Sequence, residues 1–113
     1  MIRIVLIFSG SLIPVVMILA GAMMKYYPPK DINHFIGYRT PRSKKSQASW
    51  DYAHQICGAL WMKLGFVSLL VTIIFITFVE NENAIGILVF VQMIPMLGSI
   101  VFVEKALKKK FGD

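Results

Sequence analysis

The sequence has few cysteines, few acidic residues and no catalytic motif. Its single cysteine, Cys57, excludes an intrachain disulfide and leaves the redox compartment undetermined. It contains neither a G-x-S-x-G nucleophile elbow nor a glycine-rich phosphate-binding loop. His34, His54, Asp51 and Cys57 match no established metal-ligand spacing. The sequence therefore predicts no metal and no cofactor, and it favours a function other than catalysis.

Charge is absent from three long stretches of the chain. Residues 4–24, 64–79 and 83–103 contain no ionisable side chain, and 57% of the whole sequence is hydrophobic. A helix needs roughly 20 apolar residues to cross a hydrocarbon core about 30 Å thick. The second stretch reaches this length with the apolar residues that precede it, and none alternates like a β-barrel strand. The predicted fold is an all-α integral membrane protein with three transmembrane helices.

These elements form one membrane domain, residues 1–113. The expected bounds are about 4–25 for the first helix, 46–79 for the second and 84–105 for the third, with a basic loop at 26–45 and a basic tail at 106–113. The second helix is expected to begin in the cytoplasm, before the membrane. Thr40-Pro41 blocks a helix immediately upstream, and Ser43 or Ser46 can cap its start.

Basic residues are unevenly distributed. The chain has 12 Lys and Arg against six Asp and Glu, and every basic residue except Arg3 lies at 25–63 or 105–110. The connection at 80–83 has two acids and no base. Because short basic loops stay in the cytoplasm, we expect an N-out/C-in orientation. The net charge of +6 then serves topology and attraction to the lipid bilayer, and the sequence predicts no nucleic-acid partner.

One face of the second helix carries small and polar residues at alternating steps of three and four. They are Asp51, His54, Gly58, Trp61, Gly65, Ser68 and Thr72. Small residues let helices approach closely in lipid, so Gly58, Gly65, Ser68 and Thr72 predict a helix-packing seam, with a cavity wall as the alternative. Asp51, His54 and Trp61 favour a polar site at the cytoplasmic end.

The loop between the first two helices is rich in recognition residues. Gly37 permits a backbone turn that other residues resist. The guanidinium of Arg39 can clamp a carboxylate, a phosphate or a chain terminus, and an internal pair with Asp51 is an equal alternative. The loop also has an apolar side that is expected to enter the membrane interface or to cover the bundle, made of Ile32, Phe35, Ile36 and Tyr38.

An ordered set of residues runs from 33 to 65, with a G-Y-R-T-P core, a W-x-x-A-H step and a G-x-x-W-x-x-x-G step. It comprises Asn33, Gly37, Tyr38, Arg39, Thr40, Pro41, Ser43, Trp50, Ala53, His54, Gly58, Trp61 and Gly65. This set resembles the signature of the SdpI/YfhL family of small bacterial membrane proteins. The remaining chain matches only as hydrophobic helices.

The resemblance implies a multi-pass protein of the bacterial cytoplasmic membrane, of the immunity or antimicrobial-peptide-resistance type. The family's immunity protein protects a producing bacterium from its own secreted peptide and is thought to hold a transcriptional repressor at the membrane. It is considerably longer, so this chain looks like a short three-helix form. The candidate residues for binding a peptide or a cytoplasmic regulatory protein are Asn33, Gly37, Tyr38, Arg39, Thr40, Pro41, Ser43, Trp50, Asp51, His54 and Trp61.

Two other functions stay open. Arg39, Asp51 and His54 are the expected residues of a small membrane enzyme or transporter subunit that acts on a lipid-like or anionic substrate. The small residues on the second helix are those expected of a structural bundle that forms a homo-oligomer. Three helices enclose little volume, so self-association is compatible with each of these functions.

Overall fold

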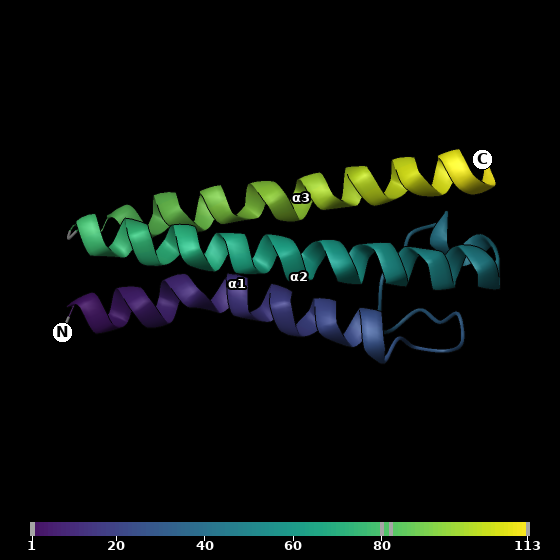
Figure 1. The fold of residues 1–113 in the computed structure, drawn as a ribbon, viewed down its shortest axis with the longest axis horizontal. Helices are drawn as coiled ribbons and strands as arrows, with labels where there is room; N and C mark the ends of the chain where they lie inside the picture. The colour runs from purple at the N-terminus through teal and green to yellow at the C-terminus, as the bar shows by residue number, and fades with distance from the viewer. Residues whose placement is uncertain (1, 80, 82, 113) are drawn as a thin grey trace.

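The computed structural model describes residues 2–79, 81 and 83–112, and these form three long helices (Figure 1). Each helix is long and apolar enough to cross a membrane, which confirms the prediction of a three-helix, multi-pass membrane protein. The orientation across the membrane stays a prediction. The elements are α1 (Ile2–Tyr26), the short 3-10 helix η1 (Ser43–Lys45), α2 (Gln47–Phe78) and α3 (Ala84–Phe111).

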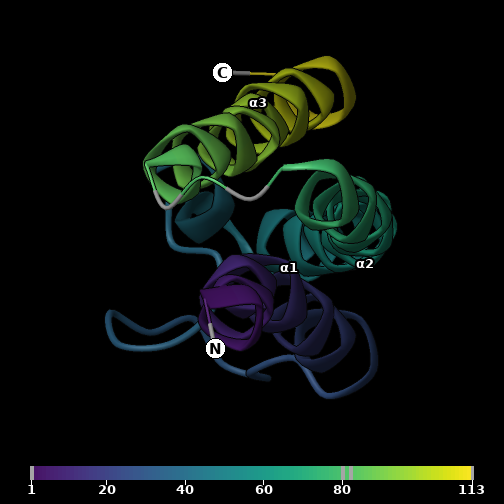
Figure 2. The same ribbon diagram turned by 90° about the vertical axis from the view of Figure 1, so that its left-hand side faces the viewer.

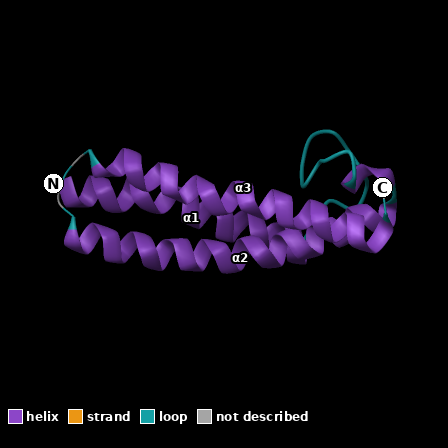
Figure 3. Ribbon diagram, turned by 90° about the horizontal axis from the view of Figure 1, so that it is seen from above, coloured by secondary structure: helices purple, strands orange, loops and turns teal. Residues whose placement is uncertain are grey.

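The helices form an elongated bundle of 49 × 23 × 20 Å. The start of α1, the end of α2 and the start of α3 lie at one end, and the long loop and the end of α3 lie at the other (Figures 1 and 3). Seen from the end, α2 lies beside both α1 and α3 (Figure 2). Large apolar side chains such as Phe8, Leu70 and Phe90 point outward, as a lipid environment requires.

The backbones of α1 and α2 touch at two glycines of α2. A methyl group added to Gly58 would lie 2.7 Å from Gly21 O, and one added to Gly65 would lie 3.0 Å from Pro14 O. Only glycine fits at such distances, so this part of the expected seam packs against α1 within the chain. Ser68 and Thr72 instead line a groove between α2 and α3.

A proline in α1 creates a polar link among all three helices. Pro14 has no N–H, so the carbonyl of Gly10 one turn earlier loses its donor within the helix. Gln92 of α3 replaces that donor, because its Nε2 lies 2.7 Å from Gly10 O and 2.8 Å from Thr72 Oγ1. Gln92 is 3% exposed. This buried side chain therefore satisfies a backbone group that the proline left open.

The third helix extends further than the sequence analysis predicted. It continues to Phe111, whereas residues 106–113 were expected to form a separate tail. Leu107 is buried, the Lys110 ammonium lies 4.1 Å from the Tyr52 ring centre, and Phe111 meets Tyr52 edge-on. Lysine also favours a helix and stabilises its C-terminal end. Residues 80, 82 and 113 of the expected turn and tail lie outside the described residues.

Candidate functional site

The signature segment begins at the end of the bundle where α1 ends and α2 begins (Figure 1), and it continues along α2 to Gly65. Its loop leaves α1 after Tyr26 and reaches η1 at Ser43. The serine that follows η1, Ser46, caps α2, because its side chain accepts a hydrogen bond from Ser49 N at 3.0 Å. The predicted cap at Ser46 is thus present, and the helix begins at Gln47.

A buried histidine fixes the returning part of the loop. Tyr38 N donates to His54 Nε2 at 3.0 Å, and His54 Nδ1 lies 2.7 Å from Trp50 O. Because Nε2 accepts, the ring proton belongs on Nδ1, which donates to the Trp50 carbonyl. The His54 side chain is fully buried. We refer to the Tyr38–His54–Trp50 connection as the histidine latch.

Gly37 and the indole ring of Trp50 make further contacts at the latch. Gly37 has a φ of 102°, and a side chain there would collide with the His54 ring, so both conformation and space require glycine. Trp50 Nε1 donates to Pro29 O at 2.7 Å, and its ring lies 4.4 Å from the His54 ring. The outgoing and returning parts of the loop are therefore both bonded to the first turns of α2.

The remaining small signature residues bond to one another. Thr40 N donates to Ser43 Oγ at 2.9 Å, and Ser43 N donates to Thr40 Oγ1 at 3.2 Å. The Ser43 hydroxyl, which is fully buried, also lies 2.9 Å from Tyr38 O. Asn33 shapes the loop tip, because its Oδ1 accepts from Phe35 N and Ile36 N. These side chains set the loop conformation, and Pro41 between them is exposed.

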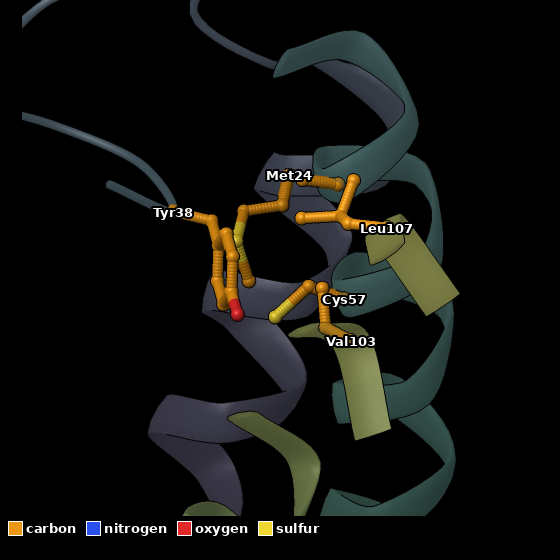
Figure 4. Packing of buried hydrophobic residues seen from close by; sticks show 6 residues of the cluster. Met24, Tyr38, Cys57, Val103 and Leu107 are labelled. Carbon is orange, nitrogen blue, oxygen red and sulfur yellow. The ribbon is translucent and has the colours of Figure 1, made fainter. Parts of the chain in front are cut away.

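Tyr38 connects the loop to the helices. Its ring lies in a cluster with Met24, Cys57, Val103 and Leu107, which come from all three helices (Figure 4). Its hydroxyl donates a long hydrogen bond of 3.5 Å to Ile100 O. Burial raises the pKa of Tyr38 above its usual value, and the charge of Glu104 adds to this shift. Tyr38 is therefore a packing residue that carries a neutral phenol.

Trp61 belongs to a different contact. Its Nε1 donates to Ser99 Oγ at 2.8 Å, and Ser99 Oγ donates to Met96 O at 2.6 Å. This chain of hydrogen bonds joins α2 to α3. The structure therefore places Trp61 in the bundle contact and not on the loop.

Arg39 and Asp51 do not pair with each other in the described structure. The Arg39 guanidinium donates to His34 O, and Asp51 Oδ1 accepts from Gln47 Nε2 at 2.9 Å. Both side chains are exposed. The same Gln47 amide donates to Lys30 O at 2.7 Å, a loop contact that the sequence analysis missed. Of the two alternatives for Arg39, the internal pair is wrong, and contact with a ligand stays a prediction.

The residues considered for catalysis do not converge. His54 is buried with both ring nitrogens bonded, while Arg39 and Asp51 point outward. Within residues 2–79, 81 and 83–112, no three His, Cys, Asp or Glu side chains lie close enough to hold a metal ion. The arrangement can therefore hold a loop rigidly and present its outer side.

The outer side of the loop combines apolar and basic residues. Phe35 is 88% exposed, Tyr27 82% and Ile36 49%. Lys30 and Arg39 of the same loop are also exposed. We refer to these residues, Tyr27, Lys30, Phe35, Ile36 and Arg39, as the loop surface. Aromatic residues and arginine are enriched where proteins bind partners.

Comparison with known proteins places this segment in a family. A model of the SdpI/YfhL protein family matches residues 30–103. An uncharacterized protein of Bacillus subtilis (strain 168), YfhL, is 43% identical over 51 residues, which are 45% of this chain and 46% of that protein. The match thus spans about half the length of this relative, and no solved structure matches the chain. Since the family model covers well over half of the sequence, the chain belongs to the SdpI/YfhL protein family.

Proposed function

We propose that this chain is a membrane protein of the immunity or antimicrobial-peptide-resistance type and that it binds a peptide or a partner protein through the loop surface. One observation carries the proposal. The signature residues that hold the loop are buried, whereas Phe35 and Arg39 are exposed on it; the buried ones are Tyr38, Ser43, Trp50 and His54. Membership of a family that includes immunity proteins supports the type of function.

Preorganisation gives the latch a role in binding. Fixing the backbone of one residue costs about 1–2 kcal/mol in conformational entropy. The bonds from His54 to Tyr38 and from Trp50 to Pro29 fix the loop before any partner arrives. A surface that is already ordered retains more of its contact energy as affinity. The buried signature residues therefore act on binding through the loop that they hold.

The charge pattern supports a cytoplasmic position for this surface. Lys30, Arg39, Lys44 and Lys45 lie in the loop, and Lys108–Lys110 lie at the same end of the bundle. Short basic segments stay inside. The loop surface would then meet a regulatory protein directly, or a membrane-active peptide that has entered the inner leaflet.

The other two functions have less support. The described Arg39, Asp51 and His54 do not share a site, as an enzyme or transporter subunit would require. The glycines expected to drive self-association, Gly58 and Gly65, are occupied by α1. A homo-oligomer would have to use another surface.

The proposal is tested by survival of a sensitive bacterium that expresses the chain, challenged with a panel of membrane-active peptides. The variants are Phe35→Ser and Arg39→Ala on the loop surface, with Gln55→Ala on α2 as a control that removes one exposed hydrogen bond to Lys25 O and leaves the loop surface unchanged. Membrane levels are matched by quantitative blotting. Protection by the wild type and the Gln55 variant, but not by the two loop variants, supports the proposal. Full protection by both loop variants contradicts the binding surface, and no protection by the wild type contradicts the immunity function.

A further inference from the structure

A groove between α2 and α3 is lined in part by Gln92, whose side-chain oxygen is buried and has no hydrogen-bond partner among the described residues. The groove holds about 180 Å³ and lies within the apolar part of the bundle. Its walls are Leu64, Val67, Ser68, Val71 and Thr72 of α2, and Leu88, Val91, Gln92 and Pro95 of α3. Val67, Val71 and Val91 are exposed on the outside of the bundle, so the groove opens toward lipid.

The unpartnered atom is Oε1 of Gln92. The amide orientation is fixed by Gly10 O, which only accepts hydrogen bonds and therefore needs the Nε2 donor; the same Nε2 also donates to Thr72 Oγ1. Oε1 then has no hydrogen-bond partner among the described residues, and it is closed to solvent. An unsatisfied buried acceptor is destabilising, and water is scarce inside a membrane. A largely apolar molecule that enters from the lipid and carries a donor would satisfy this acceptor.

The dimensions restrict the size of that molecule. The α2 wall runs from Leu64 to Thr72, which is about 12 Å at 1.5 Å per residue. A helix is about 10–12 Å across and exceeds a volume of about 180 Å³ within one turn, whereas a small molecule does not. A lipid tail has no donor for Gln92.

We propose that this groove binds a small, largely apolar molecule with one hydroxyl donor, which bonds to Gln92 Oε1 while its hydrocarbon part lies along the valines. The Ser68 hydroxyl is a second polar group in the same wall. Because Oε1 is buried, binding requires a movement of the side chains around it. This site is separate from the loop surface and does not depend on the proposed function.

The chain contains a matched control for this site. A second groove of about 160 Å³ lies between α1 and α2 and is lined by Ile7, Ser11, Ile73, Ile76 and Thr77. Its hydroxyls include Thr77 Oγ1, which already donates to Ile73 O. No unpartnered buried acceptor is found among the described residues that line it. The two grooves thus have similar size and apolar character and differ in the Gln92 carbonyl.

The test uses two photoreactive probes, a medium-chain alkanol and the matching alkane, each with a diazirine, on the full chain in lipid bilayers. Mass spectrometry measures adducts on Val67 and Val91 and, in the control groove, on Ile7 and Ile73. One net hydrogen bond corresponds to about a fivefold preference. We expect the alkanol-to-alkane ratio to be about fivefold higher in the α2–α3 groove than in the control groove.

Two variants identify the cause of that preference. Ser68→Leu fills the groove and leaves Gln92 intact, and Gln92→Met removes the acceptor at similar volume. Alkylation of the buried Cys57 reports whether each variant is folded. The alkanol excess should disappear in both, and if Gln92→Met does not fold, Ser68→Leu decides. Two results would overturn the proposal. One is an equal alkanol-to-alkane ratio in the two grooves of the wild type, as expected if only lipid tails enter them. The other is an alkanol excess that persists in a folded variant.

Discussion

His54 on α2 accepts a hydrogen bond of 3.0 Å from the backbone N–H of Tyr38, although the two residues belong to different segments of the chain. The histidine is fully buried, and its other ring nitrogen is bonded to Trp50 O. A backbone donor in the loop thus depends on one side chain of the helix. This dependence makes the latch open to direct test by substitution.

Replacing the latch histidine should destabilise the protein. His54→Ala leaves the Tyr38 N–H without its acceptor, and a buried unsatisfied donor costs about 1–3 kcal/mol. We expect a lower midpoint of thermal unfolding in detergent and faster alkylation of Cys57. His34→Ala is the matched control, because His34 is exposed. An equal effect of the two substitutions would show that the latch does not contribute to stability.

Gly37→Ala should lower the free energy of unfolding by more than a positive φ alone explains. Gly37 and Gly112 both have positive φ, at 102° and 79°, but only Gly37 has no space for a Cβ, because His54 occupies it. Backbone strain of this kind costs about 1–3 kcal/mol. We expect Gly37→Ala to exceed Gly112→Ala in lost stability, and His54→Ala to remove part of the excess. Equal losses at the two glycines would contradict the contact with His54.

The backbone contact between α1 and α2 predicts which glycines tolerate a side chain. Gly58→Leu and Gly65→Leu should separate the helices and destabilise the bundle by more than about 3 kcal/mol, because the obstructing atoms are backbone. Gly86 and Gly98 serve as controls, because a Cβ added at either glycine would meet no other part of the structure within 4 Å. Cys57 alkylation should rise for the first pair only. Unchanged alkylation in Gly58→Leu would exclude the close approach at this position.

The contribution of the Gln92 side chain to stability should depend on Pro14. Gln92→Leu leaves Gly10 O without a donor in the wild type, whereas Pro14→Ala restores an N–H within α1. Hydrogen bonds between membrane helices contribute about 0.6 to 1.7 kcal/mol. A double-mutant cycle by unfolding in detergent should give a coupling in this range, with the loss smaller in the Pro14→Ala background. Additive losses of stability would show that the contribution of the Gln92 amide does not depend on Pro14.

Alkaline pH should weaken the protein through Tyr38. Burial, and then the charge of Glu104, raise the pKa of this phenol in the folded state. The unfolded chain releases the proton above about pH 10 while the folded chain retains it, so the tyrosine's contribution to stability falls as the pH rises from there. The loss between about pH 9 and 11 should be smaller in Tyr38→Phe. The same pH dependence in both proteins would contradict the burial.

The helices and the packing of α2 follow from patterns that lie within single segments. A long apolar run has few alternatives to a membrane helix, because lipid cannot satisfy a free backbone. The spacing of Gly58 and Gly65 puts both glycines on one face, but it does not reveal that α1 is the neighbour. The end of α3 was misplaced, since the lysines at 108–110 gave no sign that Leu107 and Phe111 pack against α2.

The site was harder to predict, because its bonds go to backbone atoms. Trp50 and His54 bond to the carbonyls of Pro29 and Trp50, and a carbonyl has no distinctive residue type in a sequence. Aromatic and polar side chains at a membrane end therefore resemble a recognition surface even when they are internal. Gln92 could have been found from one clue, since a lone amide in an apolar run needs a partner and Pro14 frees a carbonyl.

The order of synthesis determines when the histidine latch can form. The contacts of Tyr38 with His54, of Trp50 with Pro29 and of Gly21 with Gly58 all lie within the first two helices and the loop between them. A chain emerges from the ribosome N-terminal end first, at about 5–20 residues per second. The loop can thus take its shape while α3 is still being translated. When α3 arrives, the surface formed by α1, α2 and the loop is already folded. Tyr38 stays exposed until Val103 and Leu107 of α3 cover it.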